Sequence, residues 1–392
     1  MQATRRTFLT MAGVAITAAG LAACAPTTTS PSASPTPTPT AAALDADALE
    51  SVFQSAFAAS GVAGAAARVR FGGQEWSSTA GVADLETQEP FPADQYVRIA
   101  SITKTFVGTV ILQMVDEGML SLDDVLETFV PGIPNGDVID IRQMLAMQSG
   151  IYDFTSDEQF GEQFDADPAM AWTIDDTIAV ILRNEPAFAP GAQTAYCDSN
   201  YALLGHIAEQ LDGRSLPDIM AERVAGPLGL AQTYYPADAS IRDPHPTPYI
   251  PATTPENAID TATPPRVAEL VNPAVAAGAG AMISTLDDLS VWGDELVEGT
   301  LLEPATQAER LKTTVFTGQK LNFGYGLGII NFNEYLGHDG AIYGFSTVVF
   351  TRPETGTQIV VVANESTNFT TPTLNIALAF INEIDPEQGI PS

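Results

Sequence analysis

The order of strand-like and helix-like segments constrains the fold of this chain more than any other feature. Two segments with the pattern of strands lie early in the chain, at residues 62–70 and 74–82, and three more lie near its end. The segments between them carry apolar residues at helical spacing instead. The pattern therefore predicts an α+β protein with one antiparallel sheet, formed by the two ends of the chain, with flanking helices and a helical middle.

Periodicity and stop signals predict the individual elements. Gly72 and Gly73 separate the first two strands as a hairpin turn, and a long amphipathic helix begins at or just after Ser101 and stops near Gly118. Residues 243–265, rich in Pro and Thr, predict a long irregular loop. The remaining predictions are helices at 44–60, 141–147, 174–182, 200–211, 216–224, 286–297 and 372–383, and strands at 326–332, 345–351 and 358–364.

Residues 1–23 have the pattern of an export signal. Arg5 and Arg6 precede an apolar stretch that is short for a membrane span and rich in Gly and Ala, which predicts a twin-arginine signal. The stretch ends in the sequence LAAC, which resembles the lipobox of bacterial lipoproteins and implies that Cys24 is lipidated and becomes the mature N-terminus. The alternative is an ordinary secretory signal with a chance cysteine.

Residues 24–43 are uncharged apart from the new N-terminus and rich in Pro and Thr, which predicts a semi-extended linker. A lipid on Cys24 would then tether the domain at 44–392 to the outer face of the cytoplasmic membrane. The domain keeps one thiol, Cys197, so an intramolecular disulfide is excluded despite export. We expect an exported lipoprotein of the cell envelope.

Charge and composition exclude two classes of function. The chain has 48 acidic and 16 basic residues, a net charge of -32, so its field repels a phosphate backbone and nucleic acid is not an expected partner. It has three histidines and two cysteines, without HExxH or paired CxxC motifs, and cannot build the usual zinc sites. We therefore expect no metal and no other cofactor.

Ser101 and Lys104 form an SxxK motif at the start of the predicted long helix. Residues three apart share a helix face, so the amino group of Lys104 can lie beside the Ser101 hydroxyl. A serine needs a neighbouring base to attack an acyl carbon, and a helix N-terminus supplies N–H groups for the developing oxyanion. So short a motif also arises by chance, and other motifs have to support it.

Two further motifs follow in order: Tyr196-Cys197-Asp198 opens a predicted helix, and His338-Asp339-Gly340 lies between predicted strands. With all three motifs in this order, the chain resembles the serine β-lactamase-like family, which includes class C β-lactamases, D-alanyl-D-alanine carboxypeptidases, D-aminopeptidases and related esterases. The resemblance covers about residues 47–385. It implies the β-lactamase/transpeptidase fold and a cofactor-free serine hydrolase.

The resemblance implies a role for each motif residue. Ser101 would be the acylated nucleophile, Lys104 and Tyr196 the proton-transfer pair, and His338 would stand in place of the third-motif lysine. The backbone N–H groups of Ser101 and Ala341 would form the oxyanion hole. Either Lys104 or Tyr196 can be the general base, because both are protonated at neutral pH unless neighbours tune them.

Two departures from the family pattern bear on the substrate. Asp198 stands where the family usually has asparagine, and Asp339 stands where threonine or serine is common. Their charges repel a substrate carboxylate. This predicts that the substrate is an ester or amide with no free carboxylate near the scissile bond, and it allows a substrate that carries an amine. Gly340 is expected beside the substrate, where a side chain would obstruct it. Cys197 is either a packing residue or a reactive thiol.

Other functions stay open at this stage. The leading hypothesis is a hydrolase of a small-molecule or cell-wall peptide substrate, a D-amino-acid peptide or amide or a small ester. Alternatives are a D-alanyl-D-alanine carboxypeptidase, a class C-like β-lactamase, or a non-catalytic cell-wall-binding lipoprotein. The natural substrate, any hydrolysis of β-lactams and the oligomeric state are not predicted.

Overall fold

The computed structural model describes residues 44–252, 262–318, 323–366 and 371–389. The chain divides into a unit at 1–41 and a unit at 42–392, and the described residues all belong to the second. The predicted signal at 1–23, the lipidation site Cys24 and the linker to residue 43 lie outside the described residues.

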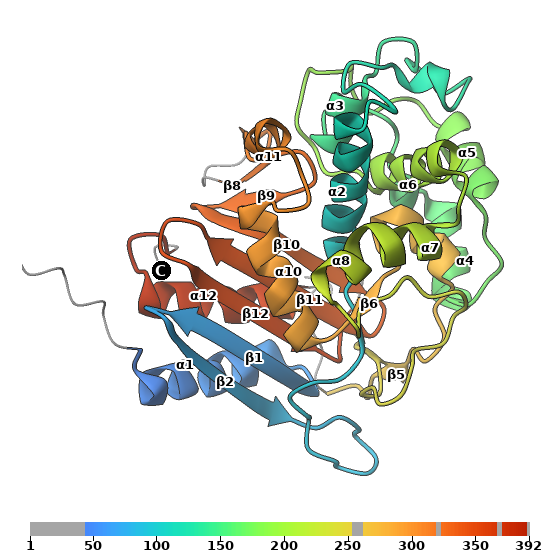
Figure 1. The fold of residues 1–392 in the computed structure, drawn as a ribbon. Coiled ribbons are helices and arrows are strands. Elements are labelled where there is room, and N and C mark those ends of the chain that lie inside the picture. The colour runs from blue at the N-terminus through green and yellow to red at the C-terminus, as the bar shows by residue number, and fades with distance from the viewer. Residues whose placement is uncertain (1–43, 253–261, 319–322, 367–370, 390–392) are drawn as a thin grey trace, which may run out of the picture. The chain divides into compact units, whose positions relative to one another are not determined.

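An eight-stranded antiparallel sheet lies at the centre of the second unit (Figure 1). The hairpin strands β1 (Gly64–Phe71) and β2 (Gln74–Gly81) join the last strand, β12 (Thr357–Ala363), with Ala65 opposite Ala363. The prediction that the two ends of the chain form one sheet is confirmed. The order then continues through β11 (Phe345–Arg352), β10 (Tyr335–Ile342), β9 (Ile330–Phe332), β8 (Phe323–Tyr325) and β7 (Thr314–Val315).

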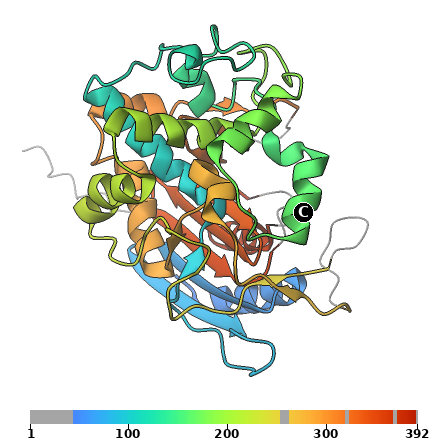
Figure 2. The ribbon, with the colours of Figure 1, turned by 90° about the vertical axis from the view of Figure 1, so that its right-hand side faces the viewer.

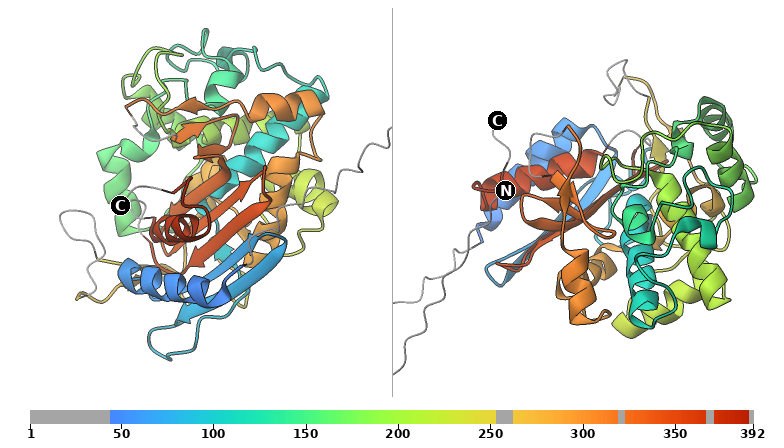
Figure 3. Two further views of the ribbon diagram at one scale, coloured as in Figure 1. Left: turned by 90° about the vertical axis from the view of Figure 1, so that its left-hand side faces the viewer. Right: turned by 90° about the horizontal axis from the view of Figure 1, so that it is seen from above.

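Helices cover both faces of this sheet. Helix α10 (Leu286–Glu298) packs on one face, and α1 (Ala46–Ser60) and α12 (Pro372–Ile384) pack together on the other (Figures 1 and 3). All seven residues of β12 are consequently buried, and its sequence is a nearly continuous apolar run in place of an alternating one. The buried sheet thus provides a rigid support for the residues at its edges.

The middle of the chain forms a helical region against the sheet (Figure 2). Helix α2 (Thr103–Asp116) is buried along most of its length, and its Phe106 ring stacks on Trp292 of α10 at 3.8 Å. The other helices of the region are α3 (Ile141–Leu145), α4 (Glu158–Ala166), α5 (Ile174–Leu182), α6 (Asp198–Asp212), α7 (Leu216–Met220), α8 (Gly226–Leu228) and α9 (Pro273–Ala276), and α11 (Pro304–Arg310) lies before β7. Short turns of helix are η1 (Ala100–Ile102), η2 (Leu126–Thr128), η3 (Phe154–Ser156), η4 (Ala221–Ala225) and η5 (Ala277–Ala279), and two small sheets pair β3 (Val97–Arg98) with β6 (Ile283–Ser284) and β4 (Tyr249–Ile250) with β5 (Arg266–Val267).

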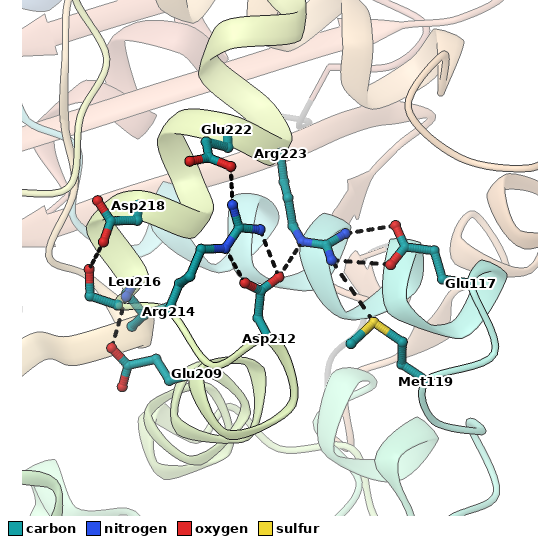
Figure 4. A network of polar contacts seen from close by, with 10 residues as sticks. Glu117, Met119, Glu209, Asp212, Arg214, Leu216, Asp218, Glu222 and Arg223 are labelled. Atoms are coloured by element: carbon teal, nitrogen blue, oxygen red, sulfur yellow. Dashed lines mark hydrogen bonds and ion pairs between the residues drawn. The ribbon is translucent and has the colours of Figure 1, made fainter.

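A network of ion pairs fastens α2, α6 and the turn η4 together (Figure 4). Asp212, the last residue of α6, accepts hydrogen bonds from Arg214 and from Arg223, and Arg223 Nη1 also contacts Glu117 Oε1 at 2.7 Å. These guanidinium partners, Arg214 first, lower the pKa of Asp212 to about 2. Asp212 therefore stays ionised at every physiological pH, and its ion pairs with Arg214 and Arg223 persist.

The structure differs from the sequence predictions at several elements, and the strand expected at 326–332 is confined to 330–332. The third motif, expected between two predicted strands, lies within a strand of its own, β10. The expected loop contains β4 within residues 243–252, and residues 262–265 lead into its partner β5. Helix α4 was not predicted, because only Phe160 and Phe164 mark its apolar face. Among the residues described, no helix is long and apolar enough to cross a membrane.

Candidate active site

Ser101 and Lys104 lie together where η1 runs into α2. Ser101 is in the middle of η1, and Ala100 before it has a positive φ of 47°, a strained conformation for alanine. Lys104 is one turn further on, fully buried, and its Nζ donates to Ser101 Oγ over 2.9 Å and to the carbonyl of Ala279 over 2.7 Å. The expected contact between the two motif residues is present.

Asp198, the first residue of α6, completes the surroundings of the lysine. Its Oδ1 lies 2.6 Å from Lys104 Nζ, and 23% of its side chain is exposed. An ammonium group has three N–H donors, and Lys104 thus has one acceptor for each: Ser101, Ala279 and Asp198. As an ammonium group, Lys104 donates to Ser101 in this arrangement.

Tyr196 precedes α6 and faces the same group of residues. Its ring centroid lies 4.8 Å from Lys104 Nζ, and its side chain interacts with that of Ser101. Desolvation raises the pKa of Tyr196 well above its ordinary value, the carboxylates of Asp198, Asp339 and Asp153 add to this rise, and the interaction with Ser101 opposes it. Tyr196 is therefore a neutral phenol in the free protein at neutral pH.

His338 lies behind Tyr196 on β10 and is buried. Desolvation and the charge of Lys104 lower the pKa of His338 to about 3, so its ring is neutral. Its Nδ1 faces the carbonyl of Asp339, which can only accept, so Nδ1 carries the proton and Nε2 accepts from the Tyr325 hydroxyl at 3.1 Å. The centroids of the His338 and Tyr196 rings are 6.1 Å apart. Both nitrogens of His338 are thus occupied, and His338 is not among the residues that line the cleft.

The rest of the third motif forms one edge of that cleft. Asp339 and Ala341 both line it, and burial raises the pKa of Asp339 to about 6. Ser101 lies on the adjacent η1, so the two N–H groups expected in the oxyanion hole come from elements that pack together. Gly340 also lines the cleft, but a Cβ there would lie 2.5 Å from the carbonyl oxygen of Ile99. Close packing of β10 on η1 is therefore one reason for glycine, and the obstruction of substrate by a side chain at this position stays a prediction.

The cleft is large and has aromatic walls. It encloses about 620 Å³, with Ser101 and Tyr196 at its lining. The aromatic side chains that contribute to its walls are Phe154, Phe160, Phe164, Phe316, Phe323 and Tyr343. Two carboxylates beside the nucleophile and apolar walls further out suit a substrate with a cationic group and an apolar group.

Sequence reasoning missed several residues of this site. Asp153, beside η3, lies close to Asp198, and desolvation with the Asp198 charge raises its pKa to about 7. Tyr325 on β8, which bonds to His338, lies in a strand that carries no motif. One sequence signal could have revealed α4, which lines the cleft. Asp157 is an N-cap residue three positions before Phe160, and this spacing is typical of a helix start.

Cys197 is a packing residue, which was one of its two expected roles, and not a reactive thiol. Its side chain is buried and its Sγ lies 3.5 Å from the carbonyl of Ile151. Desolvation raises the pKa of the Cys197 thiol well above its ordinary value, which disfavours the reactive thiolate. Within the described residues, no three His, Cys, Asp or Glu side chains are placed to hold a metal ion.

Comparison with known proteins identifies the family. The family model described as Beta-lactamase matches residues 49–382, most of the chain. The chain belongs to the β-lactamase family. A crystal structure of a D-stereospecific amidohydrolase from Streptomyces sp. resembles this member with a TM-score of 0.77 at 30% identity, covering 88% of this chain and 99% of the other.

Other relatives of this β-lactamase-family chain carry several names. A D-amino acid amidase from Ochrobactrum anthropi, solved with L-phenylalanine amide, shares the fold at a TM-score of 0.71 and 22% identity, covering 86% of this chain and 99% of the other. A D-aminopeptidase from Brucella anthropi is 30% identical over 42% of this chain, and penicillin-binding protein 4 from Amycolatopsis lactamdurans is 31% identical over 46%. Those alignments span only 31% and 47% of the two relatives.

Proposed function

We propose that this chain is a serine hydrolase that forms an acyl-enzyme on Ser101 and cleaves amides or esters of D-amino acids bearing a free amine. The observation that carries the proposal is the position of Lys104 Nζ between Ser101 Oγ and Asp198 Oδ1 at a cleft edged by a second carboxylate, Asp339. The names of the Streptomyces amidohydrolase and of the D-aminopeptidases support this substrate class.

The geometry supports a definite path for the serine proton. As Ser101 Oγ attacks the acyl carbon, its proton leaves, and the three donors of Lys104 are already occupied. Tyr196, whose side chain interacts with Ser101, accepts this proton after its phenol has released its own proton to water in the cleft. The backbone N–H groups of Ser101 and Ala341 receive the oxyanion, Tyr196 returns the proton to the leaving amine, and water then releases the acyl group.

The carboxylates explain why an amine on the substrate helps. Asp198 and Asp339 both line the cleft and both oppose ionisation of Tyr196. An ammonium group bound beside them offsets their charge, which eases the loss of the Tyr196 proton. A substrate carboxylate in the same place would be repelled and would make that loss harder. The same two residues thus favour aminopeptidase or amidase substrates over carboxypeptidase substrates.

The substitution Asp339→Thr tests this specificity. The measurement is the ratio of kcat/KM for D-phenylalaninamide to kcat/KM for a peptide ending in D-alanyl-D-alanine. We expect the substitution to lower the ratio by about tenfold or more, since it removes a charge next to the acyl site. Because the pKa of Asp339 is about 6, the wild-type ratio should also rise as the pH is raised through 6, when the carboxylate ionises.

The control for this prediction is Asp339→Asn, which keeps the size of the side chain and removes the charge. Asp339→Asn should lower the ratio of the two kcat/KM values as much as Asp339→Thr does. A wild type that already prefers the peptide with a free carboxylate, or a ratio that ignores both substitutions, would favour the carboxypeptidase or β-lactamase alternative. Failure of a serine-reactive probe to label Ser101 on folded protein would favour a non-catalytic binder.

We also propose, from the sequence alone, that the protein is exported and anchored to the membrane by a lipid on Cys24. The variant Cys24→Ser should move the protein from the membrane fraction to the soluble exported fraction, because it removes the acceptor of the lipid. Activity should not change, since residue 24 precedes the domain. Fractionation of cells followed by immunoblotting measures this, and unchanged partition into membranes would contradict the lipobox.

A further inference from the structure

Helix α4 provides one apolar wall of the cleft. Phe160, Gly161, Phe164 and Asp165 of this helix line the cleft. The wall is rigid because its rings stack on one another: Phe160 on Phe164 with centroids 5.7 Å apart, and Phe164 on Tyr343 at 4.8 Å. The carboxylate of Asp165 accepts a hydrogen bond from the Tyr343 hydroxyl, so the charged member of this wall is already partnered. This side of the cleft therefore suits an uncharged, apolar group.

Gly161 has no structural reason to be glycine. It is the fourth of nine residues of α4, its φ is not positive, and a Cβ built on it would meet no atom within 4 Å. Glycine inside a helix costs about 0.5–1 kcal/mol relative to alanine. Neither backbone conformation nor packing offsets this cost, so α4 would be more stable with almost any other residue here.

The glycines inside α2, α6 and α10 provide a comparison. A Cβ on Gly108 would lie 3.2 Å from the Cα of Gly328, one on Gly205 would lie 3.1 Å from Leu216, and one on Gly293 would lie 2.7 Å from Val349. At each of these three positions a neighbouring residue occupies the space. At Gly161 the space is part of the cleft.

We propose that Gly161 is a specificity-determining residue, which leaves room over α4 for a large apolar group of the substrate, such as an aromatic or branched aliphatic side chain. This rests on the proposed function, and it adds a second requirement to the amine. The carboxylates Asp198 and Asp339 favour a positively charged group of the substrate beside Ser101. The wall around Gly161 limits the size of the substrate's apolar group at a greater distance from Ser101.

The test is the variant Gly161→Leu, assayed with two pairs of substrates. D-Phenylalaninamide and D-alaninamide differ in the acyl side chain and share a leaving group, whereas D-alanine p-nitroanilide and D-alaninamide differ in the leaving group alone. We expect the ratio of kcat/KM, large over small, to fall at least tenfold in one pair, with Gly161→Ala intermediate. The pair that responds also identifies which half of the substrate lies over α4.

Glu162→Leu is the matched control, since it adds the same side chain at the next position of α4, which is exposed and does not line the cleft. It should leave both ratios within about twofold of wild type. Thermal unfolding should show a higher melting temperature for Gly161→Ala than for wild type. Ratios that stay constant in Gly161→Leu, or that fall equally in Glu162→Leu, would overturn the inference.

Failure of the proposed function gives a different result. If wild-type protein cleaves none of the D-amino-acid substrates, that function is wrong. The inference about Gly161 is then tested with the p-nitrophenyl esters of acetate and 3-phenylpropionate, which carry no amine. Loss of the preference for the larger ester in Gly161→Leu would still support it, and an unchanged ratio would overturn it.

Discussion

The variant Ser101→Ala should lose hydrolysis of every substrate by at least about four orders of magnitude, because no other group can form the acyl-enzyme. The fold should be retained. Ser101 is only partly buried, and Lys104 keeps Ala279 and Asp198 as acceptors when the serine oxygen is removed. Initial rates on a D-amino-acid amide and on a generic ester measure the loss, and mass spectrometry after a serine-reactive probe measures the missing acylation.

Ser77→Ala is the matched control for this variant, because Ser77 is exposed on β2 and lies outside the cleft. It should react with the probe like wild type and turn over substrate at the wild-type rate. Turnover that persists in Ser101→Ala, with a melting temperature equal to that of wild type, would contradict Ser101 as the nucleophile and would exclude an acyl-enzyme on this residue.

The second large effect concerns the pair formed by Lys104 and Tyr196. Lys104→Met and Tyr196→Phe should each lower the acylation rate by about three orders of magnitude or more, and the double variant should be little slower than the slower single variant. The physical reason is that the two act on one proton: the ammonium of Lys104, 4.8 Å from the ring, stabilises the Tyr196 phenolate, and this phenolate accepts the proton from Ser101. Pre-steady-state kinetics of acylation measures the three rates.

Two controls accompany these variants. Tyr96→Phe removes a tyrosine hydroxyl outside the cleft and should leave the acylation rate unchanged. Lys104→Met leaves Asp198 without its buried partner, so thermal unfolding has to show that the variant is folded at the assay temperature. Losses that add fully in the double variant would show that Lys104 and Tyr196 act independently.

Most of the fold could be predicted from periodicity, and the exceptions have definite causes. The hairpin of β1 and β2 and the helices α1, α6, α10 and α12 begin and end close to their predicted bounds, because apolar spacing and glycine stops mark them. The strand β10 was missed because its Gly337 and Gly340 weaken the strand pattern, although glycine is needed there for close packing on neighbouring backbone. Helix α4 was missed because it is short and carries a glycine at its centre.

The sequence by itself determined the order of the three motifs, the family they indicate, and the pairing of the two ends of the chain in one sheet, because each depends on residue types at fixed positions or spacings. Only the tertiary structure decided which groups meet across the cleft. Asp198 reaches Lys104, Asp153 reaches Asp198, and Tyr325 occupies the free nitrogen of His338. These contacts join segments far apart in the chain, and the packing of α2, α6 and the sheet brings them together, so no local pattern could have predicted them.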